Sequence, residues 1–213
     1  MPPATCADLS IDLIDGAEYL GPTPKLFRVG ASPSIAIGDG ILDVLDRKAP
    51  KSRFDCPAAE IAAGRGYLVL YASTTELGAF IETFGNRRMV TPAERKDLEL
   101  GAIGLSRPLK LIDLHSPAIV RLYEQLLDEG VCTIRNYWLT WAWSAALHRC
   151  APDADGLIYR AREAGEAGES VALFSDRARD FLLRDGPSVP VGDVSLADTQ
   201  RLFVKMTDIK WAK

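Results

Sequence analysis

The sequence has few residues of the kinds that bind metals or form disulfides. It contains two histidines, His115 and His148, and four cysteines, which lie at positions 6, 56, 132 and 150. No two cysteines form a C-x-x-C pair, so neither a structural zinc site nor any other metal cofactor is expected. In a reducing cytosol such cysteines stay unpaired, and we expect free thiols in or near the core.

Long apolar runs are also absent. No stretch approaches the roughly 18 apolar residues that a membrane span needs. The first twenty residues are acidic and lack the basic start and apolar middle of a signal peptide. We therefore expect a cytoplasmic protein. The net charge of −4 does not suit a nucleic-acid-binding surface, so direct contact with nucleic acid is not expected.

Common nucleotide and hydrolase signatures are missing as well. The chain contains no G-x-G-x-x-G or P-loop motif, no G-x-S-x-G nucleophile elbow and no internal repeat. Its 213 residues, 47% hydrophobic and 25% charged, are ordinary for a globular protein and can bury one sizeable core. We expect a single domain covering residues 1–213.

Strands and helices are predicted in a mixed order. Strands are expected at 26–30, 67–72, 155–162 and 169–174, and two more within 98–114, split at Arg107-Pro108. Helices are expected at 39–48, 117–130 and 136–150, with a helical turn from Thr91 and a helix start near 196. Residues 52–60 read as a loop or strand end punctuated by Pro57. Without regular βαβ alternation, this order predicts an α+β fold.

The most informative stretch is the strand at 67–72 and the short helix that follows it. Ser73, Thr74 and Thr75 can cap that helix. Its apolar residues cluster on one face, and Glu82 stands nearly opposite, over a small polar face. That face suits the floor of a cleft, although the spacing alone favours a solvated helix face, because glutamate is common on protein surfaces.

Several polar residues on apolar elements can be considered together. Arg28 lies in a strand, Arg53 precedes a turn, Tyr67 and Tyr71 flank a buried strand, and Glu82 ends the next helix. Tyr159, Arg160 and Arg162 lie on a late strand. Arginine suits phosphate recognition. Tyrosine offers a flat face to a heteroaromatic ring, and a carboxylate can stabilise a developing positive charge. Together they would suit a dinucleotide cleaved at a glycosidic bond, while each arginine alone is more often a surface ion-pair partner.

The helix at 136–150 carries Trp138, Trp141, Ala145 and His148 at helical spacing, and we expect most of this stripe to pack in the core. A different class of function, a hydrolase that uses a Cys or Ser nucleophile with His148, is disfavoured by that position. His148 is better explained as a core histidine.

Five segments occur in order along about residues 25–175, between an arm at 1–24 and C-terminal elements at 176–213. They are LFRVG, SRFDCP, GYLVLYASTTELGAFIETF, WAWSAALHRCAPDADGLIYRAR and ESVALF. In these segments and their order, the chain resembles the RES-domain family, toxins of bacterial toxin–antitoxin pairs. The resemblance implies a mixed sheet core with surrounding helices, like that of ADP-ribosyltransferases, and an activity on NAD as substrate.

The resemblance also assigns residues. Arg28 and Glu82 match the family's arginine and glutamate, which makes them the expected catalytic residues. Arg28, Arg53, Tyr71 and Ser170 are expected to bind NAD. The family's serine does not carry over, because Ala161 occupies its position, and Ser170 on the next strand could supply a hydroxyl instead.

The implied function is a toxin that cleaves NAD at the nicotinamide–ribose bond. ADP-ribose then passes to water, phosphate or a target protein, so the enzyme is an NAD glycohydrolase, an NAD phosphorylase or a mono-ADP-ribosyltransferase. The implied partner is a DNA-binding antitoxin protein. Ala161 motivates the alternative, an attenuated RES-like binding module that acts mainly through its antitoxin.

Overall fold

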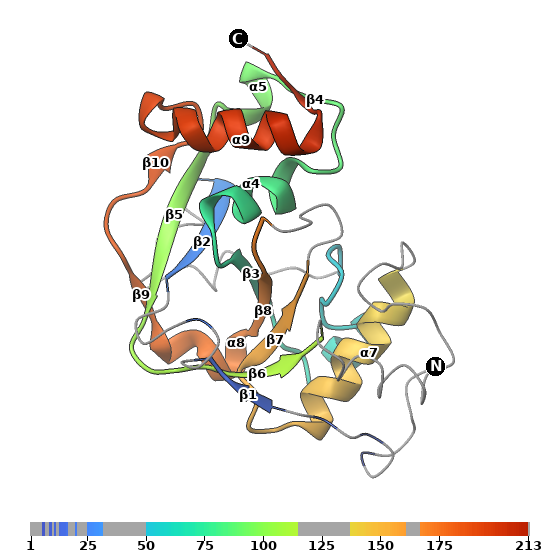
Figure 1. The fold of residues 1–213 in the computed structure, drawn as a ribbon. Coiled ribbons are helices and arrows are strands. Elements are labelled where there is room, and N and C mark those ends of the chain that lie inside the picture. The colour runs from blue at the N-terminus through green and yellow to red at the C-terminus, as the bar shows by residue number, and fades with distance from the viewer. Residues whose placement is uncertain are drawn as a thin grey trace.

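The computed structural model describes residues 6, 9, 11, 13–16, 20, 25–31, 50–114, 137–160 and 167–212. The helices expected at 39–48 and 117–130 lie outside the described residues, as does Ala161. Within the described ranges, the fold is α+β, a mixed sheet surrounded by helices, as the sequence predicts and as in an ADP-ribosyltransferase-like core (Figure 1).

The described residues build a main sheet of nine strands in the order β1-β6-β7-β8-β3-β2-β5-β10, with β9 paired to β5. Its pairs are antiparallel except for the parallel pair β6–β7. The strands are β1 (Leu13–Asp15), β2 (Leu26–Ala31), β3 (Val69–Ser73), β5 (Leu98–Leu105), β6 (Lys110–Asp113), β7 (Gly156–Tyr159), β8 (Ser170–Phe174), β9 (Leu182–Arg184) and β10 (Val189–Pro190). A separate parallel pair joins β4 (Met89–Val90) to β11 (Lys210–Trp211).

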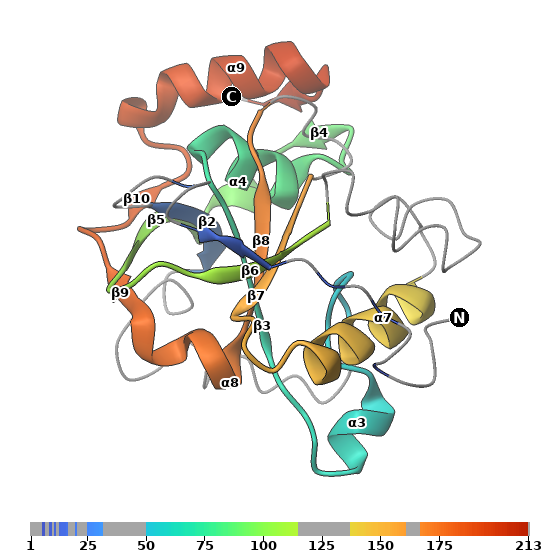
Figure 2. The ribbon, with the colours of Figure 1, turned by 60° about the horizontal axis from the view of Figure 1, so that its bottom comes forward.

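Helices pack around this sheet in separate clusters (Figures 1 and 2). The described helices are α3 (Ala58–Ala62), α4 (Glu76–Phe84), α5 (Pro92–Arg95), α7 (Tyr137–Cys150), α8 (Ser175–Ala178) and α9 (Ala197–Thr207), with short 3₁₀ turns at Arg179–Phe181 and Val194–Leu196. Helix α7 packs on the middle strands around Val69 and Leu157. Helices α4 and α9 share a second cluster with β2 and β5. None of the described helices has both the length and the apolar character that a membrane crossing requires.

Most expected elements are found, with small shifts at their ends. The strand expected at 67–72 begins at Val69, and the segment 98–114 divides into β5 and β6 around Arg107-Pro108. The prediction of a loop or strand end at 52–60 is wrong for the second half of that range, where helix α3 forms. Pro57 immediately precedes α3. Proline suits the start of a helix, because it lacks the N–H that the first turn leaves unpaired.

The core face of α7 differs from the predicted stripe. Trp138 is 53% exposed, whereas Trp143 is only 2% exposed and packs in the core with Leu139 and Leu147. The helix is apolar on several sides. Apolar residues spaced about four positions apart therefore occur on two neighbouring faces, and their spacing does not show which face is buried. His148 is half-buried, stacks on Tyr67 with ring centroids 4.0 Å apart, and hydrogen-bonds to Asp176, as suits a packed rather than a catalytic histidine.

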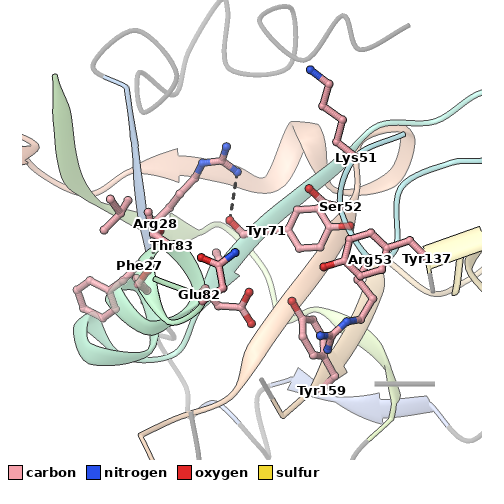
Figure 3. A pocket seen from close by; sticks show the side chains of 14 residues that line it. Phe27, Arg28, Lys51, Ser52, Arg53, Tyr71, Glu82, Thr83, Tyr137 and Tyr159 are labelled. Carbon is pink, nitrogen blue, oxygen red and sulfur yellow. Dashed lines mark hydrogen bonds between the residues drawn. The ribbon is translucent and has the colours of Figure 1, made fainter. Parts of the chain in front are cut away.

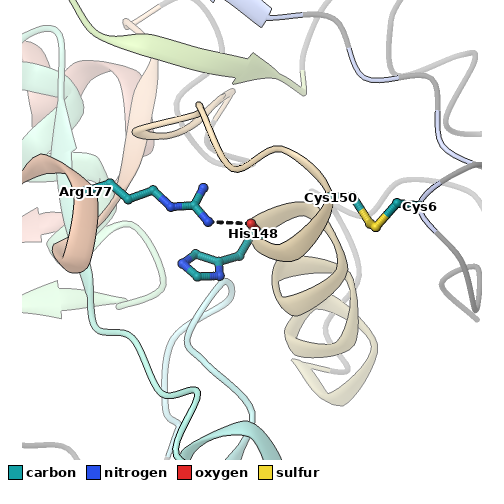
Figure 4. The surroundings of a disulfide bond; sticks show 4 residues. All are labelled: Cys6, His148, Cys150 and Arg177. Atoms are coloured by element: carbon teal, nitrogen blue, oxygen red, sulfur yellow. Dashed lines mark hydrogen bonds between the residues drawn. A yellow bond between two sulfur atoms is a disulfide. The ribbon is translucent and has the colours of Figure 1, made fainter.

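The prediction of free thiols is wrong for two cysteines. Cys6 and Cys150 form a disulfide at the C-terminal end of α7 (Figure 4). The residues are 144 positions apart, and sequence alone cannot deduce such a pairing. Cys56 is free and buried, as expected; burial raises the pKa of its thiol, so it is a poor nucleophile. Cys132 lies outside the described residues.

Candidate active site

One cavity of about 470 Å³ collects the polar residues singled out above (Figure 3). This volume falls within the roughly 300–1,000 Å³ of small-molecule sites. Its lining comes from β2, the loop at 51–53, β3, α4 and the turn after it, the start of α7 and the end of β7. The lining residues are Phe27, Arg28, Val29, Lys51, Ser52, Arg53, Tyr71, Ala72, Ala79, Glu82, Thr83, Asn86, Tyr137 and Tyr159.

Glu82 stands on α4, which is held tightly against the sheet. Thr75 caps the helix by accepting a hydrogen bond from the Gly78 N–H at 2.9 Å. Phe80 and Phe84 are fully buried on the opposite side of the helix, as the sequence predicts. Glu82 itself is exposed and faces the cavity, so its helix face is not merely a solvated surface.

Gly78 allows α4 to approach β3 this closely. A Cβ added at Gly78 would lie 2.0 Å from the Ser73 hydroxyl, which is fixed by donating to the Glu169 carbonyl at 2.9 Å. Replacing a helical glycine by alanine ordinarily stabilises a helix by about 1 kcal/mol. Here the clash opposes that gain.

We predict that Gly78→Ala destabilises the protein by about 1–3 kcal/mol, the usual cost of overpacking, and displaces Glu82. Urea denaturation measures the change. Gly104→Ala is the matched control, because its added Cβ would meet its neighbours no closer than 3.6 Å. A Gly78→Ala variant more stable than the parent protein would contradict this account of α4.

Arg28 reaches the cavity from β2. Its guanidinium donates a hydrogen bond from Nη1 to the Tyr71 carbonyl on the neighbouring strand, at 3.2 Å. The side chain is half-buried. This contact holds the Arg28 guanidinium beside β3, so its positive charge stays on the β3 side of the cavity (Figure 3).

Arg53 is presented by a loop that is fixed from several sides. The Asp55 carboxylate, 7% exposed, accepts hydrogen bonds from the backbone N–H groups of Lys51 and Ser52, both at 2.8 Å. From α7, Trp141 Nε1 donates to the Ser52 carbonyl at 2.8 Å, and the Ser144 hydroxyl donates to the Phe54 carbonyl at 2.6 Å. Such anchoring reduces the entropy lost when a ligand binds.

Tyr71 holds both arginines in place. Its carbonyl accepts from Arg28, while its hydroxyl accepts from the Phe54 N–H at 2.7 Å and donates to Asp55 at 3.0 Å. Burial, reinforced by the Asp55 charge, raises the pKa of Tyr71 well above its ordinary value. The hydroxyl therefore stays protonated and committed to the loop, which leaves the ring as the part of Tyr71 that can meet a ligand.

We predict that Tyr71→Phe keeps the ring but loosens the Arg53 loop. The substitution leaves the Phe54 N–H without its acceptor, a loss that costs about 1–3 kcal/mol for a buried group. The denaturation midpoint should fall, and the KM for the substrate should rise more than kcat falls. An unchanged midpoint together with an unchanged KM would show that the hydroxyl does not hold this loop.

The hydroxyl of Ser170, an expected ligand of NAD, contacts Glu82. It lies on β8, opposite Tyr159 and Ser73 in the sheet register, and is 1% exposed. Its hydroxyl donates to Glu82 Oε1 at 2.8 Å, and it is not among the residues that line the cavity. Ser170 therefore orients the Glu82 carboxylate, and its role as a ligand of NAD stays a prediction.

Sequence reasoning missed several residues at the site. Lys51, Asn86 and Tyr137 line the cavity, and Asp55 organises the loop beneath it. An aspartate after Lys51-Ser52-Arg53 could have suggested a turn, because aspartate often accepts from nearby backbone N–H groups. Nothing in the spacing of Tyr137 or Asn86 connects either residue to Glu82.

The charges in the cavity are unequal. Among the described residues that line it, three are cationic, Arg28, Lys51 and Arg53, and one is acidic, Glu82. Such a site suits a ligand that is anionic along most of its length and carries a positive centre near the carboxylate. Within the described residues, no group of three or more His, Cys, Asp or Glu side chains is placed to hold a metal ion.

The comparisons with known proteins assign the family. The RES domain model matches residues 26–196, and the chain belongs to this family. The match includes every residue placed in the cavity above. The family is one of toxin-like proteins associated with NAD, which gives the chain an NAD-related enzymatic activity in general terms. No curated protein matches the chain.

Proposed function

We propose that this protein cleaves NAD at the nicotinamide–ribose bond and passes ADP-ribose to water, phosphate or a target protein, as the toxin of a toxin–antitoxin pair. The observation that carries the proposal is the meeting of Arg28, Arg53, Tyr71 and Glu82 around one cavity. These residues come from four separate segments of the chain, and their chemistry matches the parts of NAD.

The two arginines bind the pyrophosphate. Each guanidinium can donate two parallel hydrogen bonds to phosphate oxygens. Arg28 is held against β3 and Arg53 is carried on an anchored loop, so both are arranged before the ligand arrives. The ring of Tyr71 packs against nicotinamide or its ribose.

Glu82 acts where positive charge develops. Nicotinamide is cationic while it is bonded to ribose, and it leaves as a neutral molecule with the electron pair of the C1′–N bond. The ribose becomes an oxocarbenium-like centre, which the Glu82 carboxylate stabilises. Water then adds at C1′ and releases one proton, or phosphate or a protein side chain adds in its place. No general acid is required, because the leaving group gains no negative charge.

The biological role follows from this chemistry. An enzyme that consumes NAD in the cytoplasm must be kept inactive until it is needed. We therefore propose an antitoxin protein that inhibits it by covering or entering the cavity. DNA binding then belongs to the antitoxin, since this chain carries a net charge of −4. Co-purification of a stable inhibitory partner supports the role, and harmless overexpression without any partner contradicts it.

Incubation of the purified protein with NAD tests the activity itself. Chromatography should detect release of nicotinamide, and intact-mass measurement of candidate acceptor proteins should separate transfer from hydrolysis by the added mass of one ADP-ribose. Failure to release nicotinamide, with NAD still bound, would favour the alternative of an attenuated binding module.

A further inference from the structure

The cavity is lined by residues of two helices. Helix α4 contributes Ala79, Glu82 and Thr83, and α7 contributes its first residue, Tyr137. In Figure 3, Glu82 and Thr83 lie left of centre and Tyr137 is labelled on the right. Arg28 and Arg53 come from neither helix but from the strand and loop that line the rest of the cavity. Tyr137 therefore adds an aromatic ring to the cavity that holds Glu82 and both arginines.

Among the described residues that line the cavity, Tyr137 has the most exposed aromatic ring. Its side chain is 36% exposed, whereas Tyr159 is 2% exposed and Phe27 and Tyr71 are half-buried. The ring of Tyr137 is tilted against Trp141, with centroids 6.5 Å apart. Trp141 is itself tied to the Arg53 loop through its hydrogen bond to Ser52. An exposed ring with a fixed neighbour is a suitable surface on which a planar ligand can stack.

We propose that Tyr137 is the stacking platform for the second heteroaromatic ring of the dinucleotide, the adenine. This inference rests on the proposed function, which places the cationic nicotinamide at Glu82 and the pyrophosphate at the two arginines. The adenine is then the remaining ring, and Tyr137 is an exposed aromatic residue of the described lining, carried by a different helix from Glu82. Stacking of a base on an aromatic side chain needs no hydrogen bond from the tyrosine hydroxyl.

Binding of the two halves of NAD tests this assignment without requiring catalysis. Adenosine 5′-diphosphate contains the adenine and pyrophosphate, and nicotinamide mononucleotide contains the other ring. By calorimetry, Tyr137→Ala should weaken binding of adenosine 5′-diphosphate by about 5- to 150-fold, the range found when a base-stacking residue is replaced by alanine. Its affinity for nicotinamide mononucleotide should not change.

Two further variants make the test specific. Tyr137→Phe should bind adenosine 5′-diphosphate as the parent protein does, because the ring is kept. Trp138→Ala is the matched control, since Trp138 is the neighbouring aromatic residue, is 53% exposed and does not line the cavity. It should bind both compounds normally.

The assignment to adenine is overturned if Tyr137→Ala binds adenosine 5′-diphosphate normally or weakens binding of both compounds equally. It is also overturned if the parent protein binds no adenosine 5′-diphosphate. Failure of the proposed function gives a different result, in which the parent protein binds both halves but releases no nicotinamide from NAD.

Discussion

Replacing Glu82 by glutamine is expected to slow NAD consumption by about 10²–10³-fold, the usual loss for one preorganised electrostatic contact. Glutamine keeps the size of the side chain and can still accept a hydrogen bond from Ser170, which lies 2.8 Å from Oε1 in the parent protein. It removes only the negative charge that faces the developing oxocarbenium ion. The fall should therefore be in kcat, with the affinity for NAD largely kept. Initial rates of nicotinamide release measure it.

Glu76→Gln is the matched control for this experiment. Glu76 lies on the same helix, accepts a hydrogen bond from Thr199 and does not line the cavity. This variant should consume NAD at close to the parent rate. If Glu82→Gln also consumed NAD at the parent rate, Glu82 would not be the catalytic carboxylate.

Replacement of either Arg28 or Arg53 by alanine should raise the KM for NAD by about 10- to 150-fold. This range corresponds to the roughly 1.5–3 kcal/mol of a hydrogen bond to a charged group. Lysine at either position should restore only part of the affinity, because an ammonium group cannot reproduce the two parallel hydrogen bonds of a guanidinium. Calorimetric titration with NAD and steady-state kinetics both report the change.

Arg201→Ala provides the control, because Arg201 is exposed on α9 and pairs only with neighbouring Asp198 among the described residues. It should bind NAD as the parent protein does. If Arg28→Ala and Arg53→Ala both bound NAD with full affinity, neither arginine would bind the pyrophosphate, and the assignment of both residues to the binding site would be wrong.

The local elements of this fold could be predicted because their patterns are local. The run at 67–72 is apolar and bounded by turn residues, and the helix after it has a threonine cap and an apolar face, so β3 and α4 were predictable. The face of α7 was not, because a helix that is apolar on several sides offers more than one packing solution. The Cys6–Cys150 disulfide joins residues that meet only in the folded chain, which local patterns do not encode.

At the site, too, some residues could be predicted from the sequence and others could not. Arg28, Arg53, Tyr71 and Glu82 were identified from residue chemistry and from the RES resemblance, and they do line one cavity. Their roles in catalysis and binding stay predictions. The supporting contacts were not predictable, because Asp55 and Trp141 act through a loop and a helix that are brought together by folding.

A crystal structure of the Glu82→Gln variant soaked with NAD tests most directly the proposal that NAD binds in this cavity with its scissile bond at Glu82. The slowed variant should retain intact NAD. We predict the C1′ atom of the nicotinamide ribose beside the substituted side chain at position 82, the pyrophosphate on Arg28 and Arg53, and the nicotinamide or its ribose against Tyr71. NAD bound elsewhere, or with its pyrophosphate away from both arginines, would contradict the account.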